Sequence, residues 1–338
     1  MLFSILDQSV AIADRPHGAS IRDTIALARH CEALGYARFW VSEHHNHPTI
    51  VGTAPEIVMA AIAATTDRIR VGSAGVMLPH YSTLKVAEQF RVLDAIAPGR
   101  IDLGLGRAPG SDGRTAFALN PLANERPEQF PADVRDLMAW VSGGTLPEGH
   151  PFRTIRAYPE GETVPETWIL GSSDYGAQVA AHFGLPYCFA WFFTDGAGGQ
   201  RALDIYKSTY RPSARHPEPN AAICIWALAA DTAEEAQHHF SSRAKTRLLR
   251  DRGLLLPLEA PEIAAAHPFT ESERERIAQM RRDAFVGTGP DVAARIAALA
   301  RQTGVQEVAI VTWAYHEAAR RRSYELLAQE LISDPSRA

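Results

Sequence analysis

A glutamate and three histidines lie close together in the stretch SEHHNH, residues 42–47. Side chains of these types can bind a metal ion, transfer protons, or lie in a solvated loop. Zinc and iron sites collect His, Cys and carboxylate ligands from several segments, and the glycine-rich segments described below carry few of them. His44 and His45 also point to opposite sides if the chain is extended. The stretch therefore favours proton transfer, with a metal hydrolase as the weaker alternative.

Small residues recur in two other segments, VGSAGV (71–76) and RIDLGLG (100–106). The residues of interest there are Ala74, Gly75, Gly104 and Gly106. A glycine in a strand allows either the close packing of two backbones or the approach of a flat ring. Each one singly favours close packing, whereas together they could form the floor of a site for a planar ligand.

Two further features are typical of phosphate binding. The segment WILGSSDYG places Gly171, Ser172 and Ser173 between a predicted strand and a helix that begins at about Asp174. Free N–H groups at a helix N-terminus, with hydroxyls beside them, bind anions, although a simple serine cap has the same sequence. Arg107 follows the glycine-rich strand and suits a phosphate. A phosphate end and a flat, glycine-lined floor predict a site for flavin mononucleotide (FMN).

Predicted strands alternate with predicted helices along the whole chain. The strand candidates are residues 2–8, 37–42, 69–76, 100–106, 166–171, 186–192, 221–229 and 307–314. The first four are spaced by about one strand–helix–strand unit each. Eight such units predict a (β/α)8 TIM barrel, in a single domain that spans residues 1–338. A doubly wound sheet with an appended domain is the alternative.

Two intervals between predicted strands are longer than one helix needs. They cover about residues 107–165 and 230–290, after the fourth and the seventh strand. We expect both to be insertions at the rim of the barrel, the end at which active sites lie in this architecture. Residues 250–285 are the candidate for a lid that keeps water out.

Composition and charge exclude several classes of function. The chain has 34 basic and 39 acidic residues and a net charge of −5, which gives no attraction to nucleic acid or to an anionic membrane. No apolar run reaches the roughly 20 residues of a membrane span, and the N-terminus has no signal-peptide features. The three cysteines have neither metal-site nor disulfide spacing. These features predict a cytoplasmic protein with buried thiols.

Five landmarks, in order, give the chain a resemblance to the bacterial luciferase-like flavin monooxygenases. They are FSILDQS, FWVSEHHN, VGSAGVMLPHYSTLKVAEQFRVLDAIAPGRIDLGLGRAPG, LGSSDYGAQVAAHFGLP and VGTGPDVAARI. The long central block is the most diagnostic, and the landmarks span nearly the whole chain. The resemblance implies a TIM barrel that binds reduced FMN at the carboxyl ends of its strands.

The resemblance also implies roles for particular residues. His44 matches the position of the family's general base, and Glu43 and His45 match its neighbours in the pocket wall. The Ala74–Gly75 bond matches a non-proline cis peptide that supports the flavin ring. The implied phosphate contacts are Arg107, Gly171, Ser172 and Ser173, flanked by Tyr175 and Gly176. An imidazole with its ordinary pKa near 6.5 would exchange protons at neutral pH.

The reaction implied by the resemblance is a two-component monooxygenation. Reduced FMN is then a cosubstrate supplied by a separate flavin reductase, and one atom of O2 passes to a small organic substrate. No G-x-G-x-x-G segment follows a predicted strand, so the sequence shows no nicotinamide-binding unit of its own. The alternatives are a deazaflavin-dependent dehydrogenase on the same barrel and a flavin-binding protein without turnover.

The sequence departs from the family pattern in two places. Gly106 stands where light-emitting subunits carry a cysteine, which disfavours bioluminescence. After the sixth strand the chain reads FAWFF where many relatives read FASHF, so Trp191 and Phe192 predict a more apolar wall. The substrates of the relatives therefore do not predict the substrate of this protein.

A homodimer is the expected assembly. The resemblance places the contact on helices that follow the early strands, here residues 54–65 and 82–97. The segment APEIVMAAIAATT is apolar on almost every side, with Glu56 as its one charged residue. An outer barrel helix needs a polar solvent face, so a second burial surface is expected, with His47 and Pro48 near the subunit boundary. Cover by the chain's own insertions is the alternative.

Overall fold

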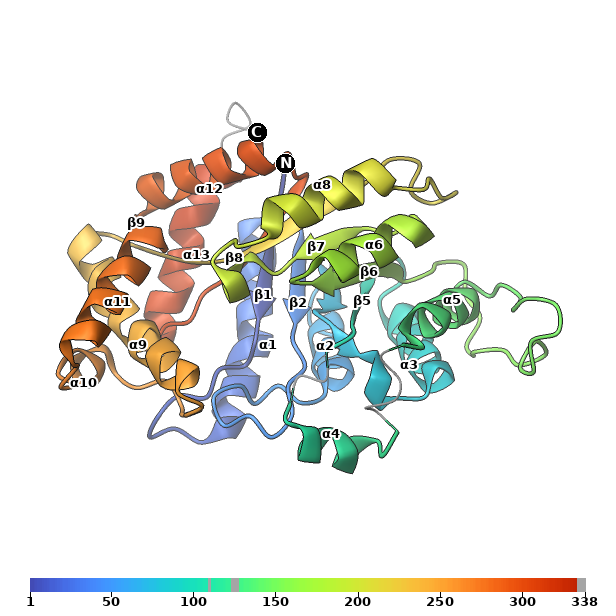
Figure 1. The fold of residues 1–338 in the computed structure, drawn as a ribbon, viewed down its shortest axis with the longest axis horizontal. Coiled ribbons are helices and arrows are strands. Elements are labelled where there is room, and N and C mark those ends of the chain that lie inside the picture. Colours follow the sequence, from blue (N-terminus) through green and yellow to red (C-terminus); the bar gives the residue numbers. More distant parts are fainter. Residues whose placement is uncertain (109–110, 123–127, 333–338) are drawn as a thin grey trace.

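A computed structural model describes residues 1–108, 111–122 and 128–332 of the chain. Its centre is a closed barrel of eight parallel strands (Figure 1). They are β1 (Leu2–Asp7), β2 (Arg38–Val41), β3 (Arg70–Ser73), β5 (Ile101–Gly106), β6 (Glu166–Gly171), β7 (Tyr187–Phe189), β8 (Ala221–Ala230) and β10 (Glu307–Val311). Each pairs with the next, and β10 pairs with both β8 and β1. The predicted barrel is confirmed, and the doubly wound alternative is wrong because such a sheet has open edges.

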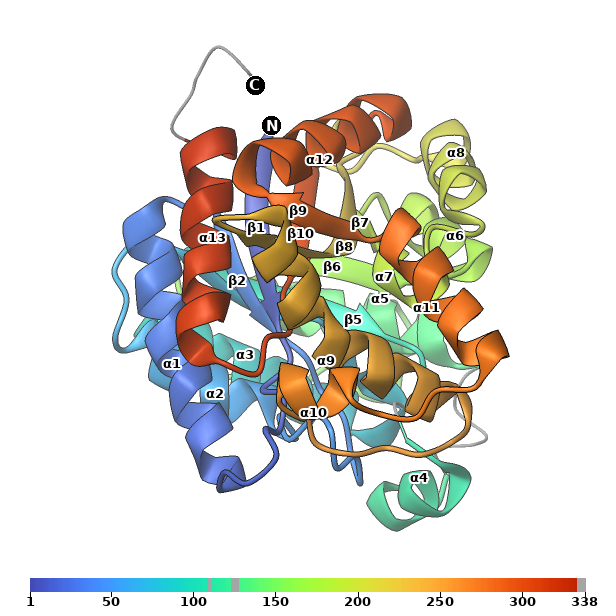
Figure 2. The same cartoon turned by 90° about the vertical axis from the view of Figure 1, so that its left-hand side faces the viewer.

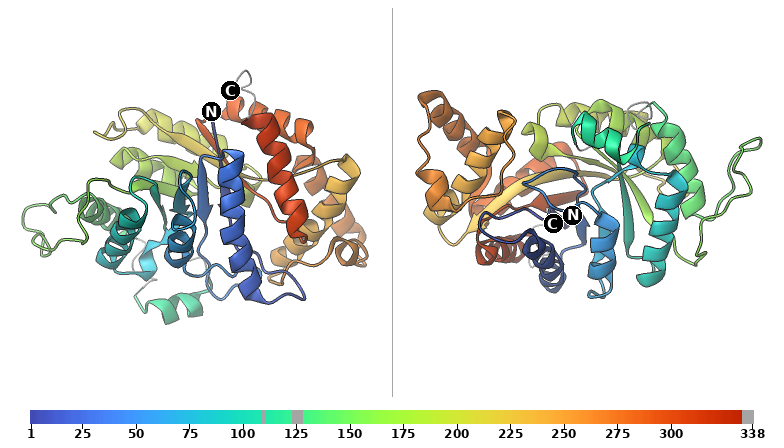
Figure 3. Two further views of the ribbon diagram at one scale, coloured as in Figure 1. Left: turned by 180° about the vertical axis from the view of Figure 1, so that it is seen from behind. Right: turned by 90° about the horizontal axis from the view of Figure 1, so that it is seen from below.

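Helices form the outer layer of the barrel (Figure 3). They are α1 (His17–Leu34), α2 (Pro55–Ala63), α3 (Thr83–Ile96), α5 (Phe130–Val141), α6 (Asp174–Phe183), α8 (Gly199–Thr209), α12 (Gly289–Thr303) and α13 (Glu317–Leu331). Gly35 ends α1 in the left-handed conformation, with φ of 88°, as its place in the sequence predicts. The same helix begins at His17, and Pro16 occupies the cap position.

Two of the predicted strand segments contain a second element. Residues 69–76 form β3 and then the short β4 (Val76–Met77), and the peptide bond Ala74–Gly75 between them is cis. The predicted strand 186–192 ends at Phe189, and the short helix α7 (Trp191–Thr194) follows it. The apolar run continues past the strand end, and periodicity in so short a run does not separate a buried strand from a helix.

The two long intervals contain different structures. The interval 107–165 contains α4 (Gly113–Leu119), which lies at the end of the barrel opposite the N-terminus (Figure 1), and then α5; residues 109–110 and 123–127 are outside the described residues. The later interval contains α9 (Ala233–Asp251), α10 (Pro261–Ala265), α11 (Glu271–Asp283) and β9 (Phe285–Thr288). Figure 2 shows these three helices together on one side of the barrel. The strand β9, which pairs with the last part of β8, was not predicted.

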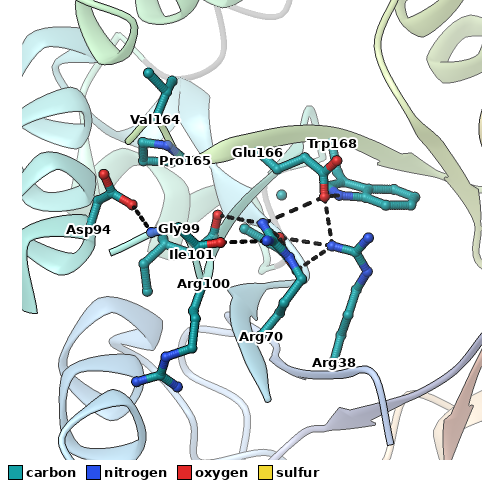
Figure 4. A network of polar contacts seen from close by, with 12 residues as sticks. Arg38, Arg70, Asp94, Gly99, Arg100, Ile101, Val164, Pro165, Glu166 and Trp168 are labelled. Atoms are coloured by element: carbon teal, nitrogen blue, oxygen red, sulfur yellow. Dashed lines mark hydrogen bonds and ion pairs between the residues drawn. The ribbon is translucent and has the colours of Figure 1, made fainter. Parts of the chain in front are cut away.

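A buried ionic network fills the end of the barrel at which the strands begin (Figure 4). Arg38 donates hydrogen bonds to Asp102 at 2.9 Å, to Glu166 at 2.7 Å and to Glu307 at 3.1 Å. Arg70 donates to Asp102 at 2.6 Å. Burial alone would lower the pKa of Arg38, but the three carboxylates raise it. Each buried charge here has a partner, so the removal of one of them would leave another buried charge uncompensated, which is costly.

The helices of the described ranges include none that is both long and apolar enough to cross a membrane. The thiols of Cys31, Cys188 and Cys224 are buried and free, as predicted. Burial raises the pKa of each of them, so all three are in the protonated form at neutral pH.

Candidate active site

A cavity of about 580 Å³ lies at the end of the barrel where the strands finish. This volume is in the range of small-molecule sites, which is about 300–1,000 Å³. Eleven of the thirteen residues predicted for the site line it: Glu43, His44, Ala74, Gly75, Gly106, Arg107, Gly171, Ser172, Ser173, Tyr175 and Gly176. The barrel thus brings together segments that are far apart in the sequence.

The other two predicted residues, Gly104 and His45, do not line this cavity. A Cβ atom on Gly104 would lie 2.0 Å from the carbonyl oxygen of Ser73, so this glycine serves the close packing of β5 against β3. His45 turns instead toward Glu43, with its Nε2 2.7 Å from the carboxylate Oε1. Their placement in the pocket wall is therefore corrected. The expectation that His44 and His45 diverge agrees with the structure, in which His44 faces the cavity.

Ala74 and Gly75 form a bare stretch of the cavity wall, and the bond between them is cis, as the resemblance implies. A Cβ atom on Gly75 would lie 2.8 Å from Leu170 Cδ1, which leaves no room for a larger residue. Gly106 is different, because a Cβ atom there would meet only the Val76 carbonyl oxygen, at 3.8 Å. A side chain at this position would occupy cavity space, so Gly106 enlarges the cavity.

One end of the cavity is suited to an anion. The guanidinium carbon of Arg107 lies 4.0 Å from the centre of the Tyr175 ring, and within the described residues this arginine has no ion-pair partner. The side-chain hydroxyls of Ser172 and Ser173 make no hydrogen bond within that same part of the chain, and they precede the N-terminus of α6. The acidic residue of this first turn, Asp174, is paired with Arg201 at 2.9 Å, which reduces its repulsion of an anion.

Glu43 is a buried hub beneath the histidine-rich loop. Its carboxylate accepts hydrogen bonds from Tyr81 Oη at 2.6 Å and from the Met77 backbone N–H at 3.0 Å, in addition to its contact with His45. Burial, and then the neighbouring Glu43, raises the pKa of Tyr81. The carboxylate therefore connects the loop after β2 to β4, and it fixes the backbone from which His44 extends.

Among the described residues that line the cavity, His44 is the one histidine. Its Nδ1 lies 3.3 Å from Ser42 Oγ, and its ring centre is 5.5 Å from that of His47. Burial, and then the neighbouring His47 and His45, lowers the pKa of His44 to about 4. The expected pKa near 6.5 is therefore wrong, because a strand-end loop in a packed barrel removes water from the ring. At pH 7 the imidazole is neutral, with one nitrogen able to accept a proton.

Some lining residues were not predicted. They include Gln8, Phe130, Cys188, Phe193 and Cys224. Gln8 directly follows β1, so its position at a strand end was the available signal, whereas the cysteines carry no signal beyond burial. Phe192 lines the cavity as expected, but Trp191 does not: it turns away and packs beside Phe189, with ring centres 6.2 Å apart. His47, expected near a subunit boundary, lines a second cavity of about 70 Å³.

Within the described ranges, no three His, Cys, Asp or Glu side chains are grouped as metal ligands would be. The residues present fit FMN on their own geometry. Arg107 and the hydroxyls of Ser172 and Ser173, which have no ion-pair or side-chain hydrogen-bond partner among the described residues, suit a phosphate at the N-terminus of α6. The wall at Ala74–Gly75, which carries no side chain larger than a methyl group, suits a flat ring.

Residues 1–307 match the family described as Luciferase-like monooxygenase. The chain is 42% identical to the uncharacterized protein YwcH of Bacillus subtilis (strain 168), over 98% of this chain and 99% of that one. It is 38% identical to a luciferase-like monooxygenase of Escherichia coli (strain K12), over 96% and 95%. The crystal structure of apo-MsnO8 superposes with a TM-score of 0.87 at 32% identity, covering 97% of this chain and 98% of that one.

Other similar proteins differ in what they bind or act on. An N-acetyl-S-alkylcysteine monooxygenase of Bacillus subtilis (strain 168) is 33% identical over 98% of both chains. The fold is shared with the oxygenating constituent of 3,6-diketocamphane monooxygenase in complex with FMN, at a TM-score of 0.72 and 18% identity over 98% of both chains. It is also shared with an F420-dependent secondary alcohol dehydrogenase, at 0.67 and 13% identity over 96% and 97%. The match of both sequence and architecture shows that this chain belongs to the luciferase-like monooxygenase family.

Proposed function

We propose that the protein is the oxygenating component of a two-component system, which uses reduced FMN and O2 to transfer one oxygen atom to a small organic substrate. The observation that carries this proposal is the composition of the 580 Å³ cavity. Its anion-binding end, its bare wall at Ala74–Gly75 and the neutral His44 occupy one continuous space. The monooxygenase names of relatives at 38% and 33% identity support the same reaction class.

Arg107, Ser172 and Ser173 would hold the phosphate of FMN, and Ala74–Gly75 would support the ring. When bound, the reduced cofactor supplies the electrons that activate O2. The chain's own contribution is binding, orientation, and control of protons and water. His44 is neutral at pH 7 because its pKa is about 4, so it can accept a proton from a group in the cavity and share it with Ser42 Oγ.

The segment after α9 is suited to keeping water away from the site. Leu258 exchanges backbone hydrogen bonds with the loop after β1, at 2.7 Å to Ala11 O and 2.9 Å from Ala13 N. Thr49 Oγ1 donates to Leu256 O at 2.7 Å, and Leu255 lines the second cavity. We therefore assign the role of a cover to this first part of the expected lid, residues 250–285.

Two partners belong to the proposal. No part of the described chain suggests a nicotinamide site, so a separate flavin reductase would supply the reduced FMN. A second copy of the chain would cover the apolar surface of α2 and α3, where Ile57 is 68% exposed. A deazaflavin-dependent dehydrogenase is the second candidate, because an F420-dependent enzyme shares the fold.

Anaerobic titration with reduced FMN, and in parallel with reduced F420, distinguishes these candidates. We expect FMN to bind and F420 not to saturate the site. Mixing the FMN complex with 18O2 should then place labelled oxygen in the product once a substrate is present. Oxidation of an alcohol by F420 without O2 would establish the dehydrogenase instead. Complete recovery of O2 as hydrogen peroxide with every candidate substrate would indicate flavin binding without oxygenation.

A further inference from the structure

The second cavity, of about 70 Å³, adjoins the first and extends toward α9. Four residues line both spaces: Gln8, His44, Phe192 and Phe193. Three arginines of α9 also line the smaller one, which we call the α9 chamber: Arg243, Arg247 and Arg250. Their spacing of four and three residues places them on one face of the helix. None of the described residues that line the chamber is an aspartate or a glutamate.

Arg243 is a buried charge of the α9 chamber, with 9% of the residue exposed. Its guanidinium carbon lies 4.2 Å from the centre of the Trp226 ring and 6.0 Å from that of Trp313. Within the described residues it makes no hydrogen bond and no ion pair. Burial, and then the nearby Arg247, lowers the pKa of Arg243. Aromatic contacts offset part of the cost of burying such a charge, but they do not replace a counter-ion.

The carboxylates near Arg243 have other partners. Asp195 lines a hollow of about 50 Å³ on the other side of this arginine. It accepts two hydrogen bonds from Arg247, at 2.7 and 2.6 Å, and Arg276 lies 3.9 Å from it. Asp283 lines the same hollow and accepts from Gln279 at 2.8 Å. Within the described part of the chain, Arg243 therefore has no hydrogen-bonded counter-ion, and Asp195, which is paired with Arg247, opposes the lowering of its pKa only in part.

Several other polar groups around the α9 chamber can donate as well. Trp313 Nε1 donates to Gln8 Oε1 at 3.0 Å, which leaves the amide N–H groups of Gln8 to donate. The Nδ1 atom of His47 accepts from the Ile50 N–H at 3.1 Å, so its proton lies on Nε2. Trp226 Nε1 and Arg247 Nε are buried without a partner in the described residues. A surplus of buried donors around a positive charge calls for an anion.

We propose that the α9 chamber binds the carboxylate of an organic acid substrate, with Arg243 as its main partner. This inference rests on the proposed function and names its substrate class. The rest of the substrate would pass His44 and Phe192, which line both cavities, and so reach the space above the cofactor site. One uncompensated guanidinium matches a single negative charge, and its planar fork matches a carboxylate. The phosphate of FMN has its own site at Arg107.

The test is a binding titration that needs no turnover. Straight-chain carboxylates from butanoate to decanoate, with their matched amides and sulfonates, are added to the full-length protein with and without oxidised FMN. Binding is followed by calorimetry and by tryptophan fluorescence, since Trp226 and Trp313 line the α9 chamber. We expect each carboxylate to bind about tenfold or more tightly than its amide. Arg243→Met should weaken the carboxylates by about 10- to 100-fold and leave the amides unchanged.

Two further variants separate recognition from folding. Arg243→Lys keeps the charge and should retain part of the preference for carboxylates. Arg252→Met removes an exposed arginine just beyond α9 that does not line the chamber, and it should leave every affinity unchanged. Ligand-free Arg243→Met should melt at the same temperature as the parent protein or higher, because it lacks an uncompensated buried charge.

Three results would overturn the assignment. One is equal weakening of carboxylates and amides by Arg243→Met, together with a lower melting temperature, which would make the arginine structural. Another is a loss of FMN affinity in that variant, which would assign Arg243 to the cofactor. The third is tighter binding of sulfonates than of carboxylates. Failure of FMN to bind, with the carboxylate preference intact, would instead refute the proposed function alone.

Discussion

The guanidinium of Arg107 stacks on the ring of Tyr175, with 4.0 Å between its central carbon and the ring centre. Arg107 follows β5, whereas Tyr175 belongs to the first turn of α6. A stacked guanidinium keeps its N–H groups in the plane of the fork, where they can bind an anion. The sequence placed Tyr175 only beside the phosphate contacts, and from this stacking we propose that Tyr175 orients Arg107.

Arg107→Ala should weaken FMN binding by about 10- to 100-fold, because it removes a charge-assisted contact to the phosphate. Riboflavin, which has the same ring but no phosphate, should bind the parent protein and the variant almost equally weakly. Fluorescence titration with both ligands measures the difference. Tyr175→Phe is the matched control, since it keeps the ring and should retain FMN affinity. An equal loss for riboflavin would show that Arg107 supports the fold.

His44→Asn should reduce oxygenation by about 100- to 10,000-fold, the usual contribution of a general base, while flavin affinity stays within a few-fold. The adjacent His45→Asn is the control, because His45 faces Glu43 rather than the cavity. The measurement is the product formed per O2 consumed, with the flavin titration run beside it. Unchanged coupling in His44→Asn, or a larger effect in His45→Asn, would exclude His44 as the base.

The stability of the protein should fall as the pH drops from about 6.5 to about 4. The pKa of His44 is lowered to about 4 by burial and then by neighbouring histidines, whereas an unfolded imidazole has a pKa near 6.5. In this window the unfolded chain takes up a proton at His44 that the folded chain does not, which favours unfolding. Above this pH window, the contribution of His44 to the stability is constant.

Urea unfolding at pH 7 and pH 5 tests this assignment. Between pH 7 and pH 5, the free energy of unfolding of His44→Asn should fall by about 1–2 kcal/mol less than that of the parent protein. Part of the slope should persist, because the pKa values of His47, His216 and His239 are also lowered, in each case mainly by burial. The control variant is His182→Asn, at an exposed position of α6. A parallel pH dependence in His44→Asn and the parent would contradict the lowered pKa.

The barrel could be predicted from the sequence because its strands are short apolar runs at regular spacing, bounded by clear helix signals such as Gly35. The elements that the sequence analysis did not predict, α7 and β9, were missed for different reasons. The apolar run after Phe189 reads the same as strand or as helix, so α7 was missed. β9 carries only four residues, Phe285–Thr288, and its pairing with β8 depends on a tertiary contact that no local pattern encodes.

The candidate site could be predicted where a residue type and a strand end coincide, as at His44, Arg107 and the Ser172–Ser173 turn. Gly104 shows the limit of this reasoning. It shares a strand face with Gly106, and only the 2.0 Å approach to Ser73 O distinguishes close packing from cavity lining. Arg243 lies in a helix whose sequence carries several charges. Only the structure shows that, among the described residues, it has no ion-pair partner.

Arg38→Met should destabilise the protein by about 3–5 kcal/mol, the usual cost of breaking a buried ionic network. It leaves Asp102 without one of its two arginines, and Glu307 without the arginine that donates to it at 3.1 Å. FMN affinity should not change, because the network lies at the end of the barrel opposite the cavity. Urea unfolding measures the loss of stability. The control is Arg68→Met, at an exposed position of the loop between α2 and β3, which should cost at most about 0.5 kcal/mol. Weaker FMN binding in folded Arg38→Met would contradict this separation.

The exposed isoleucine of α2 should decide the assembly of the protein. Ile57 is 68% exposed, and the described parts of the two insertions leave it uncovered. The one charge of this helix, Glu56, accepts a hydrogen bond from Gln89 of α3 at 3.3 Å, which joins the two helices in one surface. Ile57→Lys should therefore convert a dimer into the 36.9 kDa chain, because an apolar contact would have to bury a charge. Ile263→Lys, at an isoleucine of α10 that is 55% exposed, should leave the dimer intact. Sedimentation velocity at micromolar concentration distinguishes the species, and a parent protein that sediments as a single chain would refute the dimer.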